Sequence, residues 1–196
     1  MSKSALTMAG VIGGGGAAAA GGYSIYSAIQ PKTIKEKLLK ENFHLVSDIK
    51  DSSKLDKEWE KVLNRYKVEV NDTSKIIEKD KGSVTKEEIK KWCGDNLDSK
   101  INDSLYSKAS KWCVTFTSLS EKLTSTGKQL STNATSLKSK YDTMSEALKG
   151  EINKITVSSG TPQEGEKTKL WCSDLSKRAF ISEEDTHYRN LIQYCV

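Results

Sequence analysis

The sequence predicts a mainly α-helical protein, in which a single N-terminal transmembrane helix precedes a small helical bundle with one long heptad-like helix or helical hairpin. Three observations lead to this fold class. Residues 5–29 form an uncharged stretch of 25 residues. Apolar residues recur at steps of three and four along much of the remaining chain, which is typical of amphipathic helices. Ser, Thr and Asp residues stand where these helical patterns begin.

The N-terminal stretch 5–29 is rich in small residues, with seven Gly and seven Ala. As a helix it would reach about 37 Å, enough to cross a hydrocarbon core of roughly 30 Å. Tyr23 and Tyr26 lie near one end, where aromatic residues favour the membrane interface. We expect residues 1–30 to be a transmembrane anchor that binds the lipid membrane through 5–29. A cleaved signal peptide and a Gly/Ala-rich linker are the alternatives.

Residues 31–196 are expected to form one helical domain, which begins with a short charged helix over 32–40. Residues 42–46 are a short apolar run that could be a strand or an extended turn. Asp51 and Thr85 are predicted to begin two further helices, and Glu88 completes a capping box with Thr85. The helix after Asp51 carries an apolar stripe that consists of Leu55, Trp59, Val62, Leu63 and Tyr66.

A heptad-like seam of about 44 residues follows, and it predicts either one long helix or a helical hairpin that turns at Gly127. Its apolar positions are Leu105, Ala109, Trp112, Phe116, Leu119, Leu123, Leu130, Leu137, Tyr141, Met144 and Leu148. The middle of this region, 115–145, is rich in Ser and Thr, which lowers helix propensity. A loop is predicted near 158–166. Leu170 is expected to open the next helix, and Ser182–Asp185 to cap the last one with an acidic first turn.

Each of the four cysteines follows an aromatic residue. Their pairing is open from the sequence, since four cysteines allow three connectivities. Cys172 with Cys195 would tie together the last two helices, and Cys93 with Cys113 would tie two earlier ones. Two disulfides are expected if the domain lies outside the cell, whereas a cytoplasmic domain would bury free thiols. No metal site is expected, because no Cys-x-x-Cys pattern occurs.

The tryptophans are the predicted core aromatics, because each lies on an apolar helical stripe: Trp59, Trp92, Trp112 and Trp171. No catalytic residue, metal ligand or cofactor site is predicted, so we expect a protein that is not an enzyme. No nucleophile has a suitable motif around it. His44 is interpreted as structural and His187 as solvated.

The net charge of +5 arises from charges of both signs, so the sequence does not indicate binding to nucleic acid. The lysines after the apolar stretch, among them Lys32 and Lys40, would favour a cytoplasmic position of the following domain by the positive-inside rule. Lys3 alone marks the other side. The topology therefore stays open.

The chain resembles a paralogous family of short, uncharacterised, membrane-anchored proteins of hemotropic mycoplasmas. The residues that carry the resemblance are the Gly/Ala-rich segment ending near 23–29, Thr33–Leu38, Phe43–Val46, Trp59, the Trp-Cys pairs, Glu183–Tyr188 and Tyr194–Cys195. No activity is established for this family. The resemblance implies a surface-displayed protein with a role as a variable antigen or in host-cell contact.

Two hypotheses for the function follow. The first is a non-enzymatic, single-pass protein of the cell membrane that displays its helical domain outside the cell, for interaction with a host or self protein or for antigenic variation. The second is a membrane-tethered scaffold on the cytoplasmic side, whose heptad seam binds a partner helix.

Overall fold

The computed structural model describes residues 30–157 and 163–196. These residues form nine α-helices, two short 3-10 helices and three isolated β-bridges, but no extended strands. The prediction of a mainly helical protein is therefore confirmed. The predicted anchor over 5–29 lies outside the described residues. Among those that are described, no helix has both the length and the apolar character needed to cross a membrane.

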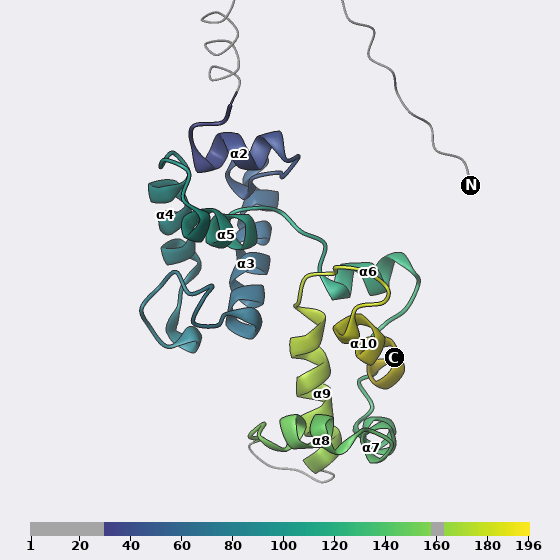
Figure 1. The fold of residues 1–196 in the computed structure, drawn as a ribbon. Coiled ribbons are helices and arrows are strands. Elements are labelled where there is room, and N and C mark those ends of the chain that lie inside the picture. Colours follow the sequence, from purple (N-terminus) through teal and green to yellow (C-terminus); the bar gives the residue numbers. More distant parts are fainter. Residues whose placement is uncertain (1–29, 158–162) are drawn as a thin grey trace, which may run out of the picture. The chain divides into compact units, whose positions relative to one another are not determined.

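The helices pack around two hydrophobic cores, which follow one another along the chain (Figure 1). The N-terminal core (34–114) is enclosed by α2 Ile34–Lys40, α3 Ser52–Glu69, α4 Lys86–Asn96 and α5 Asp103–Trp112. The C-terminal core (119–195) is enclosed by α6 Leu119–Ser125, α7 Ala134–Asp142, α8 Glu146–Asn153, α9 Gln163–Ser176 and α10 Thr186–Cys195. Each core has its own set of buried side chains.

The longest helix of the N-terminal core, α3, forms as predicted. Its N-cap is Asp51, whose carboxylate accepts a hydrogen bond of 2.8 Å from the backbone N–H of Lys54. This bond satisfies one of the amide groups that a helix start leaves unpaired. The predicted stripe lies on the buried face of α3, where Tyr66 meets the ring of Trp112 edge-on at 4.8 Å between centroids.

The short apolar run 42–46 adopts the extended-turn alternative. Leu45 forms an isolated bridge with Val114, and the backbone N–H of Val46 donates to the carbonyl of Cys113 at 3.0 Å. Leu45 and Val46 are both buried, while His44 is exposed. The run thus pins the chain just after α5 to the N-terminal core.

The prediction of a long heptad-like helix or hairpin is wrong, because the segment is divided among α5, α6, α7 and α8. Ser118 starts α6 with a capping box to Glu121, and Asn133 and Ser145 cap α7 and α8. Short polar side chains compete for backbone amides in this way and break a continuous helix. Gly127 adopts a left-handed φ of 70° just after α6. The seam residues Leu119, Leu123, Leu137 and Met144 are nevertheless buried together.

Two further boundaries differ from the predicted ones. α9 begins at Gln163, so part of the predicted loop near 158–166 is helical, and the remainder lies outside the described residues. α10 begins at Thr186 with Asp185 as its N-cap, and its first turn contains no acidic residue. The predicted acidic turn is wrong because the two preceding glutamates lie before the helix.

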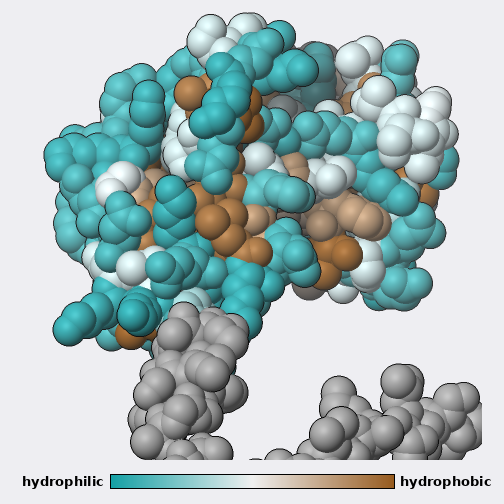
Figure 2. Space-filling model, turned by 90° about the horizontal axis from the view of Figure 1, so that it is seen from above, coloured by the Kyte–Doolittle hydropathy of each residue, from teal (hydrophilic) through white to brown (hydrophobic). Residues whose placement is uncertain are grey.

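Hydrophilic side chains cover most of the face shown in Figure 2, and hydrophobic ones are grouped near its middle. This distribution agrees with a chain in which 29% of the residues are charged. Charged side chains are found both exposed to solvent and in polar contacts between the cores.

Candidate functional site

All four cysteines form disulfides, in the pairing that ties neighbouring helices. Cys93 on α4 bonds Cys113, the residue that follows α5, with a sequence separation of 20. Cys172 on α9 bonds Cys195, the last residue of α10, with a separation of 23. Each bond therefore lies within one core, and neither crosses between them. All four side chains are buried.

The aromatic residues beside the cysteines are not equally buried. Trp112 is fully buried, and Trp59, which lies on α3 without a cysteine beside it, is 3% exposed. Trp92 and Trp171 are partly buried and pack against the N-terminal and the C-terminal core, respectively. Adjacent residues on a helix point about 100° apart. On α4 and α9 the cysteine is buried and the preceding tryptophan lies at the edge of the core, whereas Trp112 and Cys113 at the end of α5 are both buried.

The segment after the first disulfide, which leads from the N-terminal to the C-terminal core, pairs with the connection between α9 and α10 through backbone hydrogen bonds. The N–H of Phe180 donates to the carbonyl of Thr117 at 2.8 Å, and the N–H of Leu119 donates to the carbonyl of Arg178 at 2.8 Å. Ser118 and Ala179 form an isolated antiparallel bridge between these bonds. The connection between α9 and α10 is thus paired with the connection between α5 and α6.

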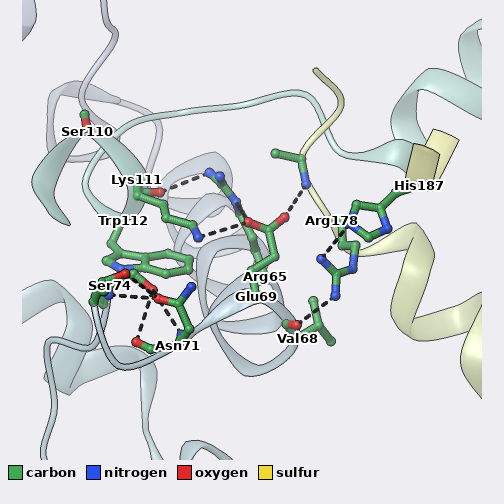
Figure 3. Close-up of polar contacts among 12 residues, drawn as sticks. Arg65, Val68, Glu69, Asn71, Ser74, Ser110, Lys111, Trp112, Arg178 and His187 are labelled. Atoms are coloured by element: carbon green, nitrogen blue, oxygen red, sulfur yellow. Dashed lines mark hydrogen bonds and ion pairs between the residues drawn. The ribbon is translucent and has the colours of Figure 1, made fainter. Parts of the chain in front are cut away.

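The mostly buried carboxylate of Glu69 lies beside this pairing (Figure 3). One oxygen of Glu69 lies 3.0 Å from Nε of Arg65 and 3.7 Å from Nζ of Lys111. The other oxygen accepts a hydrogen bond of 2.8 Å from the backbone N–H of Ala179. The side chains of Arg65 and Glu69 are each 12% exposed. A residue of the N-terminal core therefore holds the backbone of the C-terminal part with a charge-assisted bond.

The cations around Glu69 are themselves held in place. Arg65 donates through Nη1 to the carbonyl of Lys111 at 3.0 Å, and its guanidinium lies 4.6 Å from the ring centroid of Phe116. Burial lowers the pKa of Lys111, although Glu69 opposes this effect. The stacking on Phe116 and the fixed donor to the carbonyl of Lys111 suit an arginine at position 65 better than a lysine.

Arg178 forms the second polar contact between the two parts (Figure 3). Its Nη2 donates to the carbonyl of Val68 at 3.2 Å, and its Nη1 lies 3.3 Å from Nε2 of His187. Because arginine has only donors, a hydrogen bond between these atoms requires Nε2 of His187 to accept, which a neutral imidazole with its proton on Nδ1 can do. Partial burial and the neighbouring Arg178 both lower the pKa of His187. His187 is exposed, as predicted, and its ring also contacts Arg178.

The residues of this junction also line a cavity of about 320 Å³. Lys67, Trp171, Arg178 and His187 are among its walls. Within the described residues, no group of three His, Cys, Asp or Glu side chains is placed to hold a metal ion. The chemistry that the junction offers is ion pairing and hydrogen bonding.

Part of this junction has a signal in the sequence. Arg65 and Glu69 are four residues apart on one helix, the spacing at which opposite charges pair. The partners Arg178 and Ala179 lie 110 residues from the N-terminal residues that they contact, and no local pattern connects them.

No family model, curated protein or solved structure matches this chain. The resemblance to the proteins of hemotropic mycoplasmas therefore stays a prediction from the sequence.

Proposed function

We propose that this protein is a non-enzymatic, membrane-tethered display protein, whose helical domain lies outside the cytoplasm and contacts a host or self protein. The observation that carries this proposal is the pair of disulfides, one in each core, which together engage every cysteine of the chain. Disulfides persist in oxidising surroundings and are rare in the cytosol.

The position of the disulfides supports the same location. In the chain-entropy model, closing loops of 20 and 23 residues stabilises each core by roughly 3 kcal/mol. Small cores gain most from such crosslinks, because they bury little apolar surface. A small domain displayed outside the cell would therefore benefit from both bonds.

The uncharged stretch 5–29 supplies the tether in this proposal. The resemblance to the mycoplasma family supports the same location and suggests contact with a host cell as the role. Antigenic variation would be served by the Ser/Thr-rich region 115–145, if paralogues differ there.

The competing proposal is a scaffold on the cytoplasmic side of the membrane. The lysines that follow residue 29 favour it through the positive-inside rule. The seam that would have bound a partner helix is, however, divided among four helices: the apolar residues of α5 lie in the N-terminal core, and those of α6, α7 and α8 lie in or against the C-terminal core. The scaffold would therefore need a different binding surface.

Protease treatment of intact cells, combined with thiol labelling, tests the location. We expect the domain to be degraded from outside and its cysteines to react with a maleimide only after reduction. A cytoplasmic protein probed in the same cells controls for lysis. Protection from the protease together with four labelled thiols before reduction would establish the cytoplasmic scaffold instead.

A further inference from the structure

The described chain begins directly before α2, at the N-terminal core (Figure 1). The uncharged stretch 5–29 ends three positions before Lys32. Three residues reach at most about 11 Å, even when the chain is fully extended. If 5–29 lies in the membrane, as proposed above, the start of α2 therefore lies close to the lipid headgroups.

The start of α2 is fixed to the rest of the N-terminal core. Ile34 and Leu38 are both 0% exposed, so one face of this short helix is fully buried. The backbone N–H of Ile34 donates to the carbonyl of Ser99 at 3.0 Å. Thr33 forms an isolated bridge with Lys100. The connection between α4 and α5 therefore lies beside the start of α2, and both are close to the end of the tether.

The surface next to the tether combines basic and exposed apolar side chains. We define this tether-side surface by its lysines and exposed apolar residues on α2, just before it and on the adjoining connection: Lys32, Lys35, Leu39, Lys40, Lys100 and Ile101. Leu39 is 44% exposed and Ile101 is 37% exposed. Apolar side chains beside lysines suit a protein surface that lies at the boundary between headgroups and acyl chains.

The charge of the tether-side surface is positive. The side chains of Lys32, Lys35 and Lys100 form no ion pair within the described residues. The neighbouring carboxylates are fewer than the lysines, and they belong to Glu36, Glu41 and Asp98. Glu36 is already engaged, because it accepts hydrogen bonds from the backbone N–H groups of Lys32 and Thr33. Lysines next to a membrane segment are attracted to anionic headgroups.

We propose that the tether-side surface lies on the anionic headgroups of the membrane that holds the tether. Its lysines pair with lipid phosphates, while Leu39 and Ile101 contact the upper part of the acyl chains. This inference rests on the membrane tether of the proposed function, but not on the side of the membrane. It gives the lysines after residue 29 a role in a domain outside the cytoplasm, where the positive-inside rule does not account for them.

Paramagnetic broadening of methyl signals tests this contact in the full chain held in lipid nanodiscs. The lipid is phosphatidylcholine, with or without phosphatidylglycerol, and a small share carries a nitroxide on its headgroup. We expect the signals of Leu39 and Ile101 to broaden in anionic nanodiscs, and at least about twofold less in neutral ones. Leu170 on α9 is the matched control, since it is 43% exposed and lies off this surface. Conservative substitutions to Val assign the three signals.

Paired lysine variants locate the contact. Lys32→Gln combined with Lys100→Gln should reduce the broadening in anionic nanodiscs by at least about twofold. Both side chains are exposed, so folding should not change. Lys128→Gln combined with Lys154→Gln removes the same charge from exposed positions in the C-terminal part and should leave the broadening unchanged.

Salt provides a second test that needs no variant. Raising the salt concentration from about 0.1 M to about 1 M shortens the screening length from about 10 Å to about 3 Å. The broadening at Leu39 and Ile101 should then fall towards its value in neutral nanodiscs. This measurement on the unchanged protein decides the question even if the lysine variant does not fold.

The proposal is overturned by broadening that is equal in the two lipid mixtures and insensitive to salt, because closeness to the tether alone would produce it. Equal broadening of Leu170 would also overturn it, since the domain would then have no preferred face. A chain that separates from the nanodiscs in gel filtration would overturn the tether as well. The two failures are thus distinguishable, because a retained chain without lipid-dependent broadening contradicts only the surface contact.

Discussion

The two cores of this protein each contain one disulfide but differ in what they bury. The N-terminal core contains two deeply buried tryptophans, Trp59 and Trp112, and an 18-residue helix. Among the described residues of the C-terminal core, Trp171 is only partly buried, and the largest buried rings are those of Tyr188 and Tyr194. Large aromatic side chains dominate the burial of apolar area. The N-terminal core therefore obtains more of its stability from packing.

The two disulfides, by contrast, close loops of nearly equal length. They span 20 and 23 residues, so the chain-entropy model gives about the same stabilisation for each. A similar stabilisation from the disulfide is thus a larger fraction of the total stability in the C-terminal core than in the N-terminal core. The comparison teaches that cysteine spacing alone does not reveal how much a core depends on its disulfide.

Truncation of a tryptophan should produce the largest difference between the cores. Trp112→Ala removes a fully buried ring and leaves the carbonyl of Ser74 without its donor, so we expect a loss of roughly 3–5 kcal/mol in the free energy of unfolding. Trp171→Ala should cost clearly less, because its ring is partly exposed. Urea denaturation of both variants measures this. Equal losses would show that the C-terminal core depends on its aromatic residue as much as the N-terminal one does.

Removal of each disulfide should have the next largest effect. Replacing Cys172 and Cys195 by Ser, or Cys93 and Cys113 by Ser, should each cost about 3 kcal/mol. We expect hydrogen exchange to show that the first pair opens the C-terminal helices, whereas the second leaves the N-terminal helices protected. The reverse order of protection would refute the proposed difference between the cores.

A glycine comparison tests how closely the helices pack. Gly165 on α9 is buried, and a Cβ there would overlap the backbone carbonyl of Ala134 on α7. Gly165→Ala should therefore lower the free energy of unfolding by roughly 1–3 kcal/mol. Gly94→Ala on α4 meets no atom and should raise it by up to about 1 kcal/mol. Thermal denaturation distinguishes these opposite signs, and a neutral Gly165→Ala would mean that α7 and α9 can separate at little cost.

The smallest expected effect is a pH dependence at the junction of the cores. Partial burial and Arg178 lower the pKa of His187 from its usual 6.5, against the opposing effects of Asp185, Glu69 and Glu151. The folded protein then binds fewer protons than the unfolded chain. His187 therefore contributes stability above about pH 6.5 that is lost as the pH falls below it.

The variant His187→Gln should flatten this loss between pH 7 and pH 5. His44→Gln serves as the control, because the side chain of His44 forms no hydrogen bond or ion pair within the described residues, whereas that of His187 contacts Arg178. Melting temperatures across this range provide the measurement. If the melting temperature of His187→Gln depends on pH as it does in the unchanged protein, the Arg178–His187 contact does not contribute to the stability of the junction.

Local patterns predicted the parts of this fold that depend on neighbouring residues. The helix starts at Asp51 and Thr85 were predicted correctly, because capping bonds reach only two or three residues along the chain. The buried stripe of α3 follows from the helical repeat for the same reason. Four cysteines allow three pairings. The short distances along the chain favoured the observed pairing of Cys93 with Cys113 and Cys172 with Cys195, but they did not exclude the other two.

Patterns failed where two local signals competed. The seam from Leu105 to Leu148 has helical spacing throughout, yet Ser118, Asn133 and Ser145 each start a new helix within it. The spacing correctly selected several residues that become buried, but it could not show that they reach the core from separate helices. Likewise, Trp92 and Trp171 lie on apolar stripes but at the edges of their cores.

The sequence by itself determined the helical class, the main helix starts of the N-terminal part and the presence of cysteines in positions that permit two short crosslinks, since these depend on interactions within one or two helical turns. Only the tertiary structure decided the division into two cores, the junction at Glu69 and Arg178, and the unpaired indole of Trp59. Glu69 meets Ala179 across 110 residues, and Trp59 is unpaired because no described acceptor reaches it. Such contacts depend on how distant segments pack, and no periodicity along the chain encodes them.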